Sequence, residues 1–306
     1  MIPSFPEDAT ITSIHLACVH AGRAPDIRSS WSEVYSSVFP RKENVFGFKA
    51  ERFAHVLLGR ERHALELVRK HSLLPWVIDP LSDVGRQSHE AIACGDKSML
   101  MSIIASRCGV RMAPSPRICR FCTSSDLLNF GFAHLRVLHQ VPGIHFCQHH
   151  GSALHDQCAH CHASIAIDGP WRLTGGGCSN CNGDETTASF AHNESPGSKS
   201  FSLLLQRILG GSESKQLLHA PTREQMRRIY IGKPHSPQQL LRQFLDWWRV
   251  ETVDDLALIL DTEINVDRTV TFLRGNIQPL PYPLLTALAA FTRHLASDPQ
   301  GFAQTD

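Results

Sequence analysis

Apolar residues near the N-terminus recur at helical spacing, at positions i, i+3, i+4, i+7 and i+8, which places them on one side of a helix. These residues are Ile11, Ile14, His15, Cys18 and Val19. Gly22 follows the last of them, and a glycine just past the periodic positions is typical of a helix end. The pattern therefore predicts a first helix that ends near Gly22.

Similar patterns continue through residues 1–115. Ser30 followed by Glu33 has capping-box spacing and predicts a helix that starts there and runs through Val38. Residues 48–71 have a helical pattern with a probable break at Gly59. We therefore expect residues 1–115 to form an N-terminal region of short helices, similar to a helix-turn-helix.

Helical periodicity fades between residues 116 and 184, where cysteine, histidine and glycine concentrate. Such a segment is expected to be held by metal ions rather than by an apolar core. Residues 185–200 are polar and rich in turn formers, which predicts a linker. Residues 201–306 return to helical patterns and predict a C-terminal helical domain. The fold class expected is mostly α with a central module of two tandem zinc fingers.

Within the C-terminal domain, residues 252–295 have the layout of a helix-turn-helix, with 266–274 as the candidate recognition helix. Thr252 and Asn265 are expected N-caps, and Gly275 is expected just past a helix end. The residues expected to face outward and contact nucleic acid are Asn265, Arg268, Thr271 and Arg274. A three-helix unit that binds protein fits the same pattern equally well. Upstream, Ser236 and Pro237 predict the start of another amphipathic helix.

Composition narrows the function classes. Net charge is +1, whereas proteins that grip long duplex DNA usually carry a strong basic excess. Any nucleic-acid contact should therefore be local or shared with partners. The longest apolar run, residues 284–291, is too short to cross a bilayer, and the N-terminus lacks a secretory pattern. We expect a cytoplasmic protein, where ten cysteines favour metal binding over disulfides.

Four pairs of candidate metal ligands are each separated by two residues. They are Cys119 and Cys122, Cys147 and His150, Cys158 and Cys161, and Cys178 and Cys181. This spacing lets both side chains of a tight turn, a knuckle, reach one tetrahedral ion. Sixteen residues separate the last two pairs, and this gap is typical of a two-knuckle zinc ribbon. Twenty-four residues separate the first two pairs. The sequence predicts two Zn²⁺ ions per chain.

Sequential pairing of the knuckles needs the least chain crossing, so we expect the first two pairs to form one site and the last two the other. A cross-braced arrangement, with Cys147/His150 joined to Cys158/Cys161, is the alternative. His149 could replace His150 only by tightening its knuckle, and we expect His139 to be buried and hydrogen-bonded. Each site has four protein ligands and no open position, which is typical of structural zinc.

One enzymatic alternative is a zinc-stabilised His-Asn-His nuclease, which also surrounds a histidine-rich core with cysteine pairs. Such a site needs a histidine base with asparagine and histidine around a catalytic ion. Here His149 and His150 lie on the knuckle itself, and Asn129 precedes them. The pattern therefore favours a protein without catalytic residues.

Residues 117–161, RICRFCTSSDLLNFGFAHLRVLHQVPGIHFCQHHGSALHDQCAHC, resemble the core of the TniQ/TnsD family of transposon target-selection proteins. The resemblance covers about residues 3–181. The matching positions are Arg117, Cys119, Cys122, Asp126, Arg136, His139, Gln140, Pro142, Gly143, Cys147, His150, Gly151, Leu154, Cys158 and Cys161. Arg120 stands where the family usually has proline, and the common aromatic pair before Arg136 is missing. Neither departure removes a ligand.

The resemblance implies a targeting adaptor that recruits the AAA+ ATPase TnsC and thereby the transposase. Family members find their target by docking on an RNA-guided CRISPR effector such as Cascade, or by binding an attachment-site DNA directly. The near-neutral charge favours the first mode, because base pairing then supplies the sequence recognition. The resemblance further implies a bacterial, nucleoid-associated protein and a homodimer, with neither a membrane nor a small-molecule substrate as partner.

Overall fold

The computed structural model describes most of the chain, in several stretches. They are residues 4–22, 26–35, 46–59, 64–78, 83–103, 115–165, 171–172, 177–189, 194–210, 224, 236–276 and 280–297. The chain divides into two compact units. The first comprises residues 1–102 and 112–192, and the second comprises residues 103–111 and 193–306.

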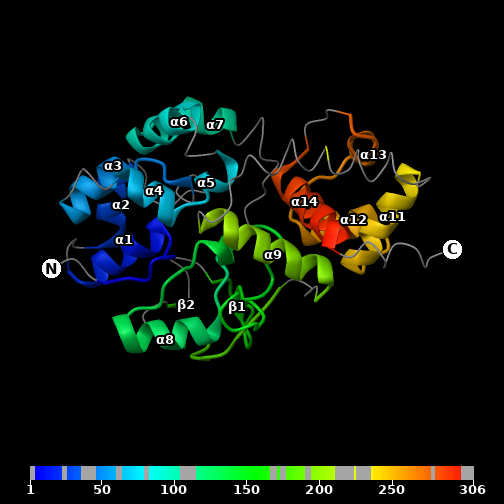
Figure 1. The fold of residues 1–306 in the computed structure, drawn as a ribbon. Coiled ribbons are helices and arrows are strands. Elements are labelled where there is room, and N and C mark those ends of the chain that lie inside the picture. The colour runs from blue at the N-terminus through cyan, green and yellow to red at the C-terminus, as the bar shows by residue number, and fades with distance from the viewer. Residues whose placement is uncertain are drawn as a thin grey trace. The chain divides into compact units, whose positions relative to one another are not determined.

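The N-terminal part of the first unit consists of short helices around an aromatic and aliphatic core (Figure 1). The helices are α1 (Ile11–His20), α2 (Ile27–Tyr35), α3 (Ala50–Phe53), α4 (Ala64–His71), α5 (Leu74–Val77), α6 (Asp83–Cys94) and α7 (Lys97–Ile103). A π-helical turn, η2 (Ala54–Leu58), continues α3. Trp31, Phe46, Phe53 and Trp76 are fully buried in this part, so its apolar periodicity is satisfied by packing.

Two predictions for this part are confirmed and one is wrong. Helix α1 ends at His20 with Ala21 as its C-cap, and Gly22 follows with φ of 74°. The break at Gly59 is also present, with φ of 64°. The helix predicted to start at Ser30 instead begins at Ile27, because the Asp26 carboxylate accepts a hydrogen bond from the Ser29 N–H at 2.9 Å. Residues 36–38 of that prediction lie outside the described residues.

The cysteine-rich part of the first unit has little regular structure. It contains helix α8 (Arg120–Phe130) and a 3₁₀ turn, η5 (Leu138–Gln140). The four strands have two residues each: β1 (Gln157–Cys158), β2 (Trp171–Arg172), β3 (Gly177–Cys178) and β4 (Thr186–Thr187). Strand β1 pairs with β4 and β2 with β3, both antiparallel. Strands this short cannot hold a chain alone, so other restraints are needed.

The second unit is a helical bundle with its own core. Its helices are α9 (Pro196–Leu209), α11 (Pro237–Trp248), α12 (Val253–Ile259), α13 (Val266–Leu273) and α14 (Tyr282–Ser297). Helix α9 packs against α14 and α11, and α11 packs against α13. The ring centroids of Phe244 and Phe291 are 5.2 Å apart, and those of Phe201 and Trp248 are 5.8 Å apart. These contacts have the geometry expected of aromatic pairs in a core.

Local signals in the second unit were accurate. Ser236 caps α11 in a full capping box with Pro237 in the first turn, and Thr252 and Asn265 cap α12 and α13. Gly275 follows α13 with φ of 82°. Residues 185–200 are not simply a linker, because they contain β4 and the start of α9.

The fold class is confirmed at a coarse level: the structure is mostly helical, with few strands and two cysteine clusters. Among the described residues, no helix is long and apolar enough to cross a membrane.

Candidate metal centres

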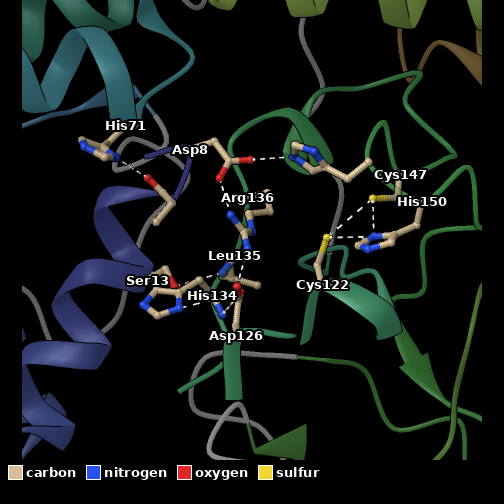
Figure 2. Close-up of polar contacts among 12 residues, drawn as sticks. Asp8, Ser13, His71, Cys122, Asp126, His134, Leu135, Arg136, Cys147 and His150 are labelled. Atoms are coloured by element: carbon tan, nitrogen blue, oxygen red, sulfur yellow. Dashed lines mark hydrogen bonds and ion pairs between the residues drawn. The ribbon is translucent and has the colours of Figure 1, made fainter. Parts of the chain in front are cut away.

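The first cluster brings together Cys119, Cys122, Cys147 and His150 from two knuckles. Figure 2 shows three of these ligands converging. The Nδ1 atom of His150 lies 3.5 Å from the Cys119 sulfur, 3.4 Å from the Cys122 sulfur and 3.5 Å from the Cys147 sulfur. The Cys122 and Cys147 sulfurs are 3.6 Å apart. The cluster therefore offers three thiolates and one imidazole to a single point.

The second cluster contains only cysteines: Cys158, Cys161, Cys178 and Cys181. Two sulfur contacts join its two knuckles, with 3.6 Å between Cys158 and Cys181 and 3.5 Å between Cys161 and Cys178. All four cysteines are free thiols. This cluster can therefore offer four thiolates to one ion.

These spacings fit a tetrahedral ion. With metal–sulfur bonds of about 2.3 Å and metal–nitrogen bonds of about 2.0 Å, neighbouring ligand atoms lie about 3.5–3.8 Å apart. The observed distances of 3.4–3.6 Å are close to that range. The grouping is the sequential one predicted, and the cross-braced alternative is excluded, because Cys147 and His150 lie with Cys119 and Cys122.

The four knuckles share one backbone hydrogen bond. The N–H four residues after each first ligand donates to that ligand's carbonyl oxygen, at 2.7–3.1 Å. These bonds run from Thr123 to Cys119, Gly151 to Cys147, His162 to Cys158, and Asn182 to Cys178. Gly151, His162 and Asn182 have positive φ, whereas Thr123 continues into α8. The turn therefore exists in the backbone itself and holds both ligands of each pair on one side.

Two further contacts shape the clusters. The backbone N–H of Cys161, together with that of His160, donates to the Cys158 sulfur and lowers the pKa of that thiol to about 6. Stabilising a thiolate in this way favours metal ligation. In the first cluster, the Ser152 hydroxyl lies 3.2 Å from the Cys119 sulfur. Ser152 is not among the residues predicted from the sequence, although its place directly after His150–Gly151 is a local signal.

His149 is not a ligand. Its Nε2 atom lies 3.4 Å from the Asp8 carboxylate, while the neighbouring imidazole of His150 points to the sulfurs (Figure 2). Asn129, which the nuclease hypothesis required near these histidines, instead donates from α8 to the Ser125 hydroxyl at 3.2 Å. Asn129 therefore makes this hydrogen bond within α8 and not with His149 or His150.

An ion-pair network lies beside the first cluster, with Asp126 buried and Asp8 partly exposed (Figure 2). Arg136 donates to Asp126 through one guanidinium nitrogen and to Asp8 through another. The backbone N–H of His134 also donates to Asp126, at 3.0 Å. Burial raises the pKa of Asp126 to about 6, against the opposing charge of Arg136. For Asp8 burial acts in the same direction, but the charge and hydrogen bond of Arg136 outweigh it and the pKa is lowered.

The network joins the N-terminal helices to the cysteine-rich part. Residue 9 forms an antiparallel bridge with residue 136, and the Leu135 N–H donates to the Ser13 hydroxyl at 2.9 Å. His71 contacts the Ala9 carbonyl at 2.7 Å. Asp8 had no sequence signal, because its partner Arg136 is 128 residues away.

Three further positions of the resemblance, Arg117, His139 and Gln140, are buried in the fold. Arg117 is buried and donates to the carbonyl oxygens of Ile144 at 3.1 Å and Val141 at 3.4 Å. The Gln140 amide exchanges hydrogen bonds with the Arg117 backbone, at 2.8 and 3.1 Å. His139 is buried as predicted, but its Nε2 atom has no hydrogen-bond partner. Burial lowers its pKa to about 4 and keeps the ring neutral.

The candidate nucleic-acid residues lie on or next to α13. Arg268 and Arg274 are exposed, and Thr271 is half-buried. The Asn265 side chain is exposed, but its oxygen accepts the Arg268 N–H at 2.9 Å as the helix cap. Three of the four therefore lie on the surface, and one of these three already has a structural role.

No family model matches this chain, and no curated protein matches it either.

Proposed function

We propose that each cluster binds one structural Zn²⁺ ion. The observation that carries this proposal is the convergence of four cysteine or histidine atoms at tetrahedral spacing, twice, with no ligand position left for a substrate. Three or four thiolates favour zinc over the hard cations magnesium and calcium, which prefer oxygen ligands. The ions would fix the knuckles, and no chemical step is assigned to them.

The metal content tests this directly. Elemental analysis of the purified full chain should give two zinc ions per chain, and Cys158→Ser should give about one. Cys94→Ser is the matched control, because Cys94 is an exposed thiol outside both clusters, and this variant should keep both ions. A folded wild-type protein without zinc would overturn the proposal.

We further propose that the protein is a non-catalytic targeting adaptor of DNA transposition. It links target recognition, by an RNA-guided CRISPR effector such as Cascade, to the AAA+ ATPase TnsC and the transposase. Support comes from the resemblance of residues 117–161 to the family and from the contacts that the matching residues make in the fold. Arg117, Asp126, Arg136 and Gln140 all build the scaffold around the first cluster, and none is arranged as a catalytic group.

Surface charge supports effector docking over direct DNA reading. Five carboxylates are exposed along residues 251–276, at Glu251, Asp254, Asp255, Glu263 and Asp267. Arg268 and Arg274 are the exposed bases of α13 and its end. A helix that enters a DNA groove needs a basic surface, because phosphates repel carboxylates. The α12–α13 pair therefore fits a protein partner better than a duplex.

Co-purification with candidate partners separates the two targeting modes. An effector-docking adaptor should co-purify with the CRISPR ribonucleoprotein in fixed stoichiometry and bind TnsC, and Arg268→Ala or Arg274→Ala should change neither. Arg242→Ala serves as a control on the exposed side of α11. Tight, steeply salt-dependent binding to one duplex, with relaxed preference in the α13 variants, would instead show direct DNA reading.

Cleavage assays address the enzymatic alternative. Purified protein should leave plasmid DNA intact in the presence of Mg²⁺ or Mn²⁺. Metal-dependent nicking that persists in Cys94→Ser and is lost in Asn129→Ala would overturn the non-catalytic proposal.

A further inference from the structure

The two clusters differ in how their sulfurs meet solvent. In the first cluster, Cys119, Cys122 and Cys147 are 1%, 4% and 1% exposed, and the exposed ligand is His150. In the second cluster, two sulfur ligands, Cys161 and Cys181, are exposed. Oxidants reach an exposed thiolate far more readily than a buried one, and imidazole is not oxidised under the same conditions.

Each exposed cysteine of the second cluster has a buried partner. Cys161 lies 3.5 Å from Cys178, and Cys181 lies 3.6 Å from Cys158. Both Cys158 and Cys178 are fully buried, and they belong to an apolar cluster with Ile118 and Phe132 among its members. The cluster therefore contains two pairs, each with one sulfur at the surface and one held in the core.

We propose that the second cluster is a redox modification site for small peroxides such as hydrogen peroxide. Oxidation converts its four thiolates into two knuckle-to-knuckle disulfides and releases its metal ion, while the first cluster keeps its own. This inference rests on the zinc occupancy proposed above.

The chemistry balances with peroxide as the oxidant. The exposed Cys161 thiolate attacks one peroxide oxygen, the O–O bond breaks, a sulfenic acid forms on Cys161, and the other peroxide oxygen leaves as hydroxide. The Cys178 thiolate then attacks that sulfur, so the S–S bond forms as the S–O bond breaks and a second hydroxide leaves. Two protons from the buffer convert both hydroxides into water. A second peroxide oxidises Cys181 and Cys158 in the same way.

The fold suits a reversible change of this kind. Cys158 and Cys178 lie in β1 and β3, so the new bonds would still join the two knuckles. The first cluster and its ion-pair network contain none of the oxidised sulfurs. Thiol reductants should therefore restore metal binding, because the resolving cysteines stay within contact distance of their partners.

Zinc release and cysteine mapping on the full chain test the inference. Zinc-replete protein is treated with hydrogen peroxide while a chromogenic chelator reports free zinc and differential alkylation with peptide mapping follows each cysteine. One zinc per chain should be released about tenfold faster than the second. The first cysteines to become resistant to alkylation should be Cys158, Cys161, Cys178 and Cys181, linked as Cys161–Cys178 and Cys158–Cys181. Dithiothreitol with added zinc should reverse both changes.

Two controls make the outcomes decisive. Cys94→Ser removes an exposed thiol outside the clusters and should leave the release rate unchanged. Fewer than two zinc ions in the purified protein would contradict the metal proposal itself. When two ions are present, three outcomes would overturn the redox inference and leave the metal proposal intact. These are simultaneous release of both ions, no release, and earlier oxidation of Cys119, Cys122 or Cys147.

Discussion

The cysteine-rich residues 115–189 and the second unit differ in what orders them. Eight tryptophan and phenylalanine side chains are fully buried among the described residues, and none of them lies in 115–189. The second unit contributes Phe201, Phe244, Trp248 and Phe291 to that group. The cysteine-rich part has instead two clusters, four knuckles and an ion-pair network. Aromatic packing dominates the core of the second unit, whereas the cysteine-rich part adds metal ligands and polar contacts to a smaller apolar cluster.

This difference means that the two regions should respond to different perturbations. A segment with two-residue strands cannot offset its conformational entropy by burial alone. A structural zinc site can supply on the order of 10–16 kcal/mol, comparable to a domain's whole stability of about 5–15 kcal/mol. The second unit needs no such contribution.

Metal removal should give the largest effect. A strong chelator under reducing conditions should unfold residues 115–189, because each lost site removes on the order of 10–16 kcal/mol from that region. Hydrogen exchange should show loss of protection there and unchanged protection in α9, α11 and α14. Protection that persists in β1 and α8 after zinc loss would contradict the idea that metal ions order residues 115–189.

A core truncation should do the reverse. Phe244→Ala should destabilise the second unit by about 3–5 kcal/mol, because it leaves a cavity beside Phe291. The loss, measured by denaturant unfolding with a probe in that unit, should be the same with and without chelator. Leu258→Ala is the control, since that side chain is 78% exposed, and it should change little.

The ion-pair network should matter almost as much in the first unit. Arg136→Met leaves Asp126, which is 1% exposed, without its partner and should cost about 3–5 kcal/mol. Adding Asp126→Asn should recover part of that loss. Arg86→Met removes the ion pair between the exposed side chains of Arg86 and Asp83, and it should lower the free energy of unfolding by at most about 1 kcal/mol. Equal losses for Arg136 and Arg86 would exclude a structural role for the network.

Acid should weaken the first unit through its buried histidines. Burial lowers the pKa of His15 from 6.5 to about 3, so below the ordinary value the unfolded chain binds a proton that the folded chain does not. The stability from neutral His15 is complete above its ordinary pKa and declines as the pH falls, by about 2 kcal/mol at about pH 5.

His15→Gln should flatten the dependence of unfolding free energy on pH in this range, because glutamine does not titrate. Both proteins keep all metal ligands, so any effect of pH on metal binding is the same in the two. His20→Gln, at the exposed end of the same helix, is the control. Parallel unfolding profiles for wild type and His15→Gln between about pH 7 and about pH 5 would argue against a neutral buried ring.

The smallest effect should come from Ser152. Ser152→Ala removes the hydroxyl at 3.2 Å from the Cys119 sulfur and should weaken zinc binding at the first cluster by about tenfold. Competition with a chromogenic chelator measures this change. Ser124→Ala, whose hydroxyl contacts only the Arg120 carbonyl within α8, should leave the affinity unchanged.

Local chemistry made much of this structure predictable. The cap residues Ser236, Thr252 and Asn265 begin their helices where the sequence placed them, because a cap acts within one turn. Knuckle spacing likewise identified the ligand pairs, since two residues between ligands form a closed turn. The start of α2 was misplaced because two capping signals compete there, and Asp26 prevails over Ser30.

Only the tertiary structure decided how distant parts combine. In the tertiary structure the knuckles pair sequentially, and Asp8 forms an ion pair with Arg136. Cys161 and Cys181 are exposed there, whereas Cys158 and Cys178 are buried. Ligand types and turn geometry are set by residues a few positions apart, and the sequence displays these directly. Solvent exposure and long-range ion pairs depend on which surfaces meet, and that follows from the packing of the whole unit.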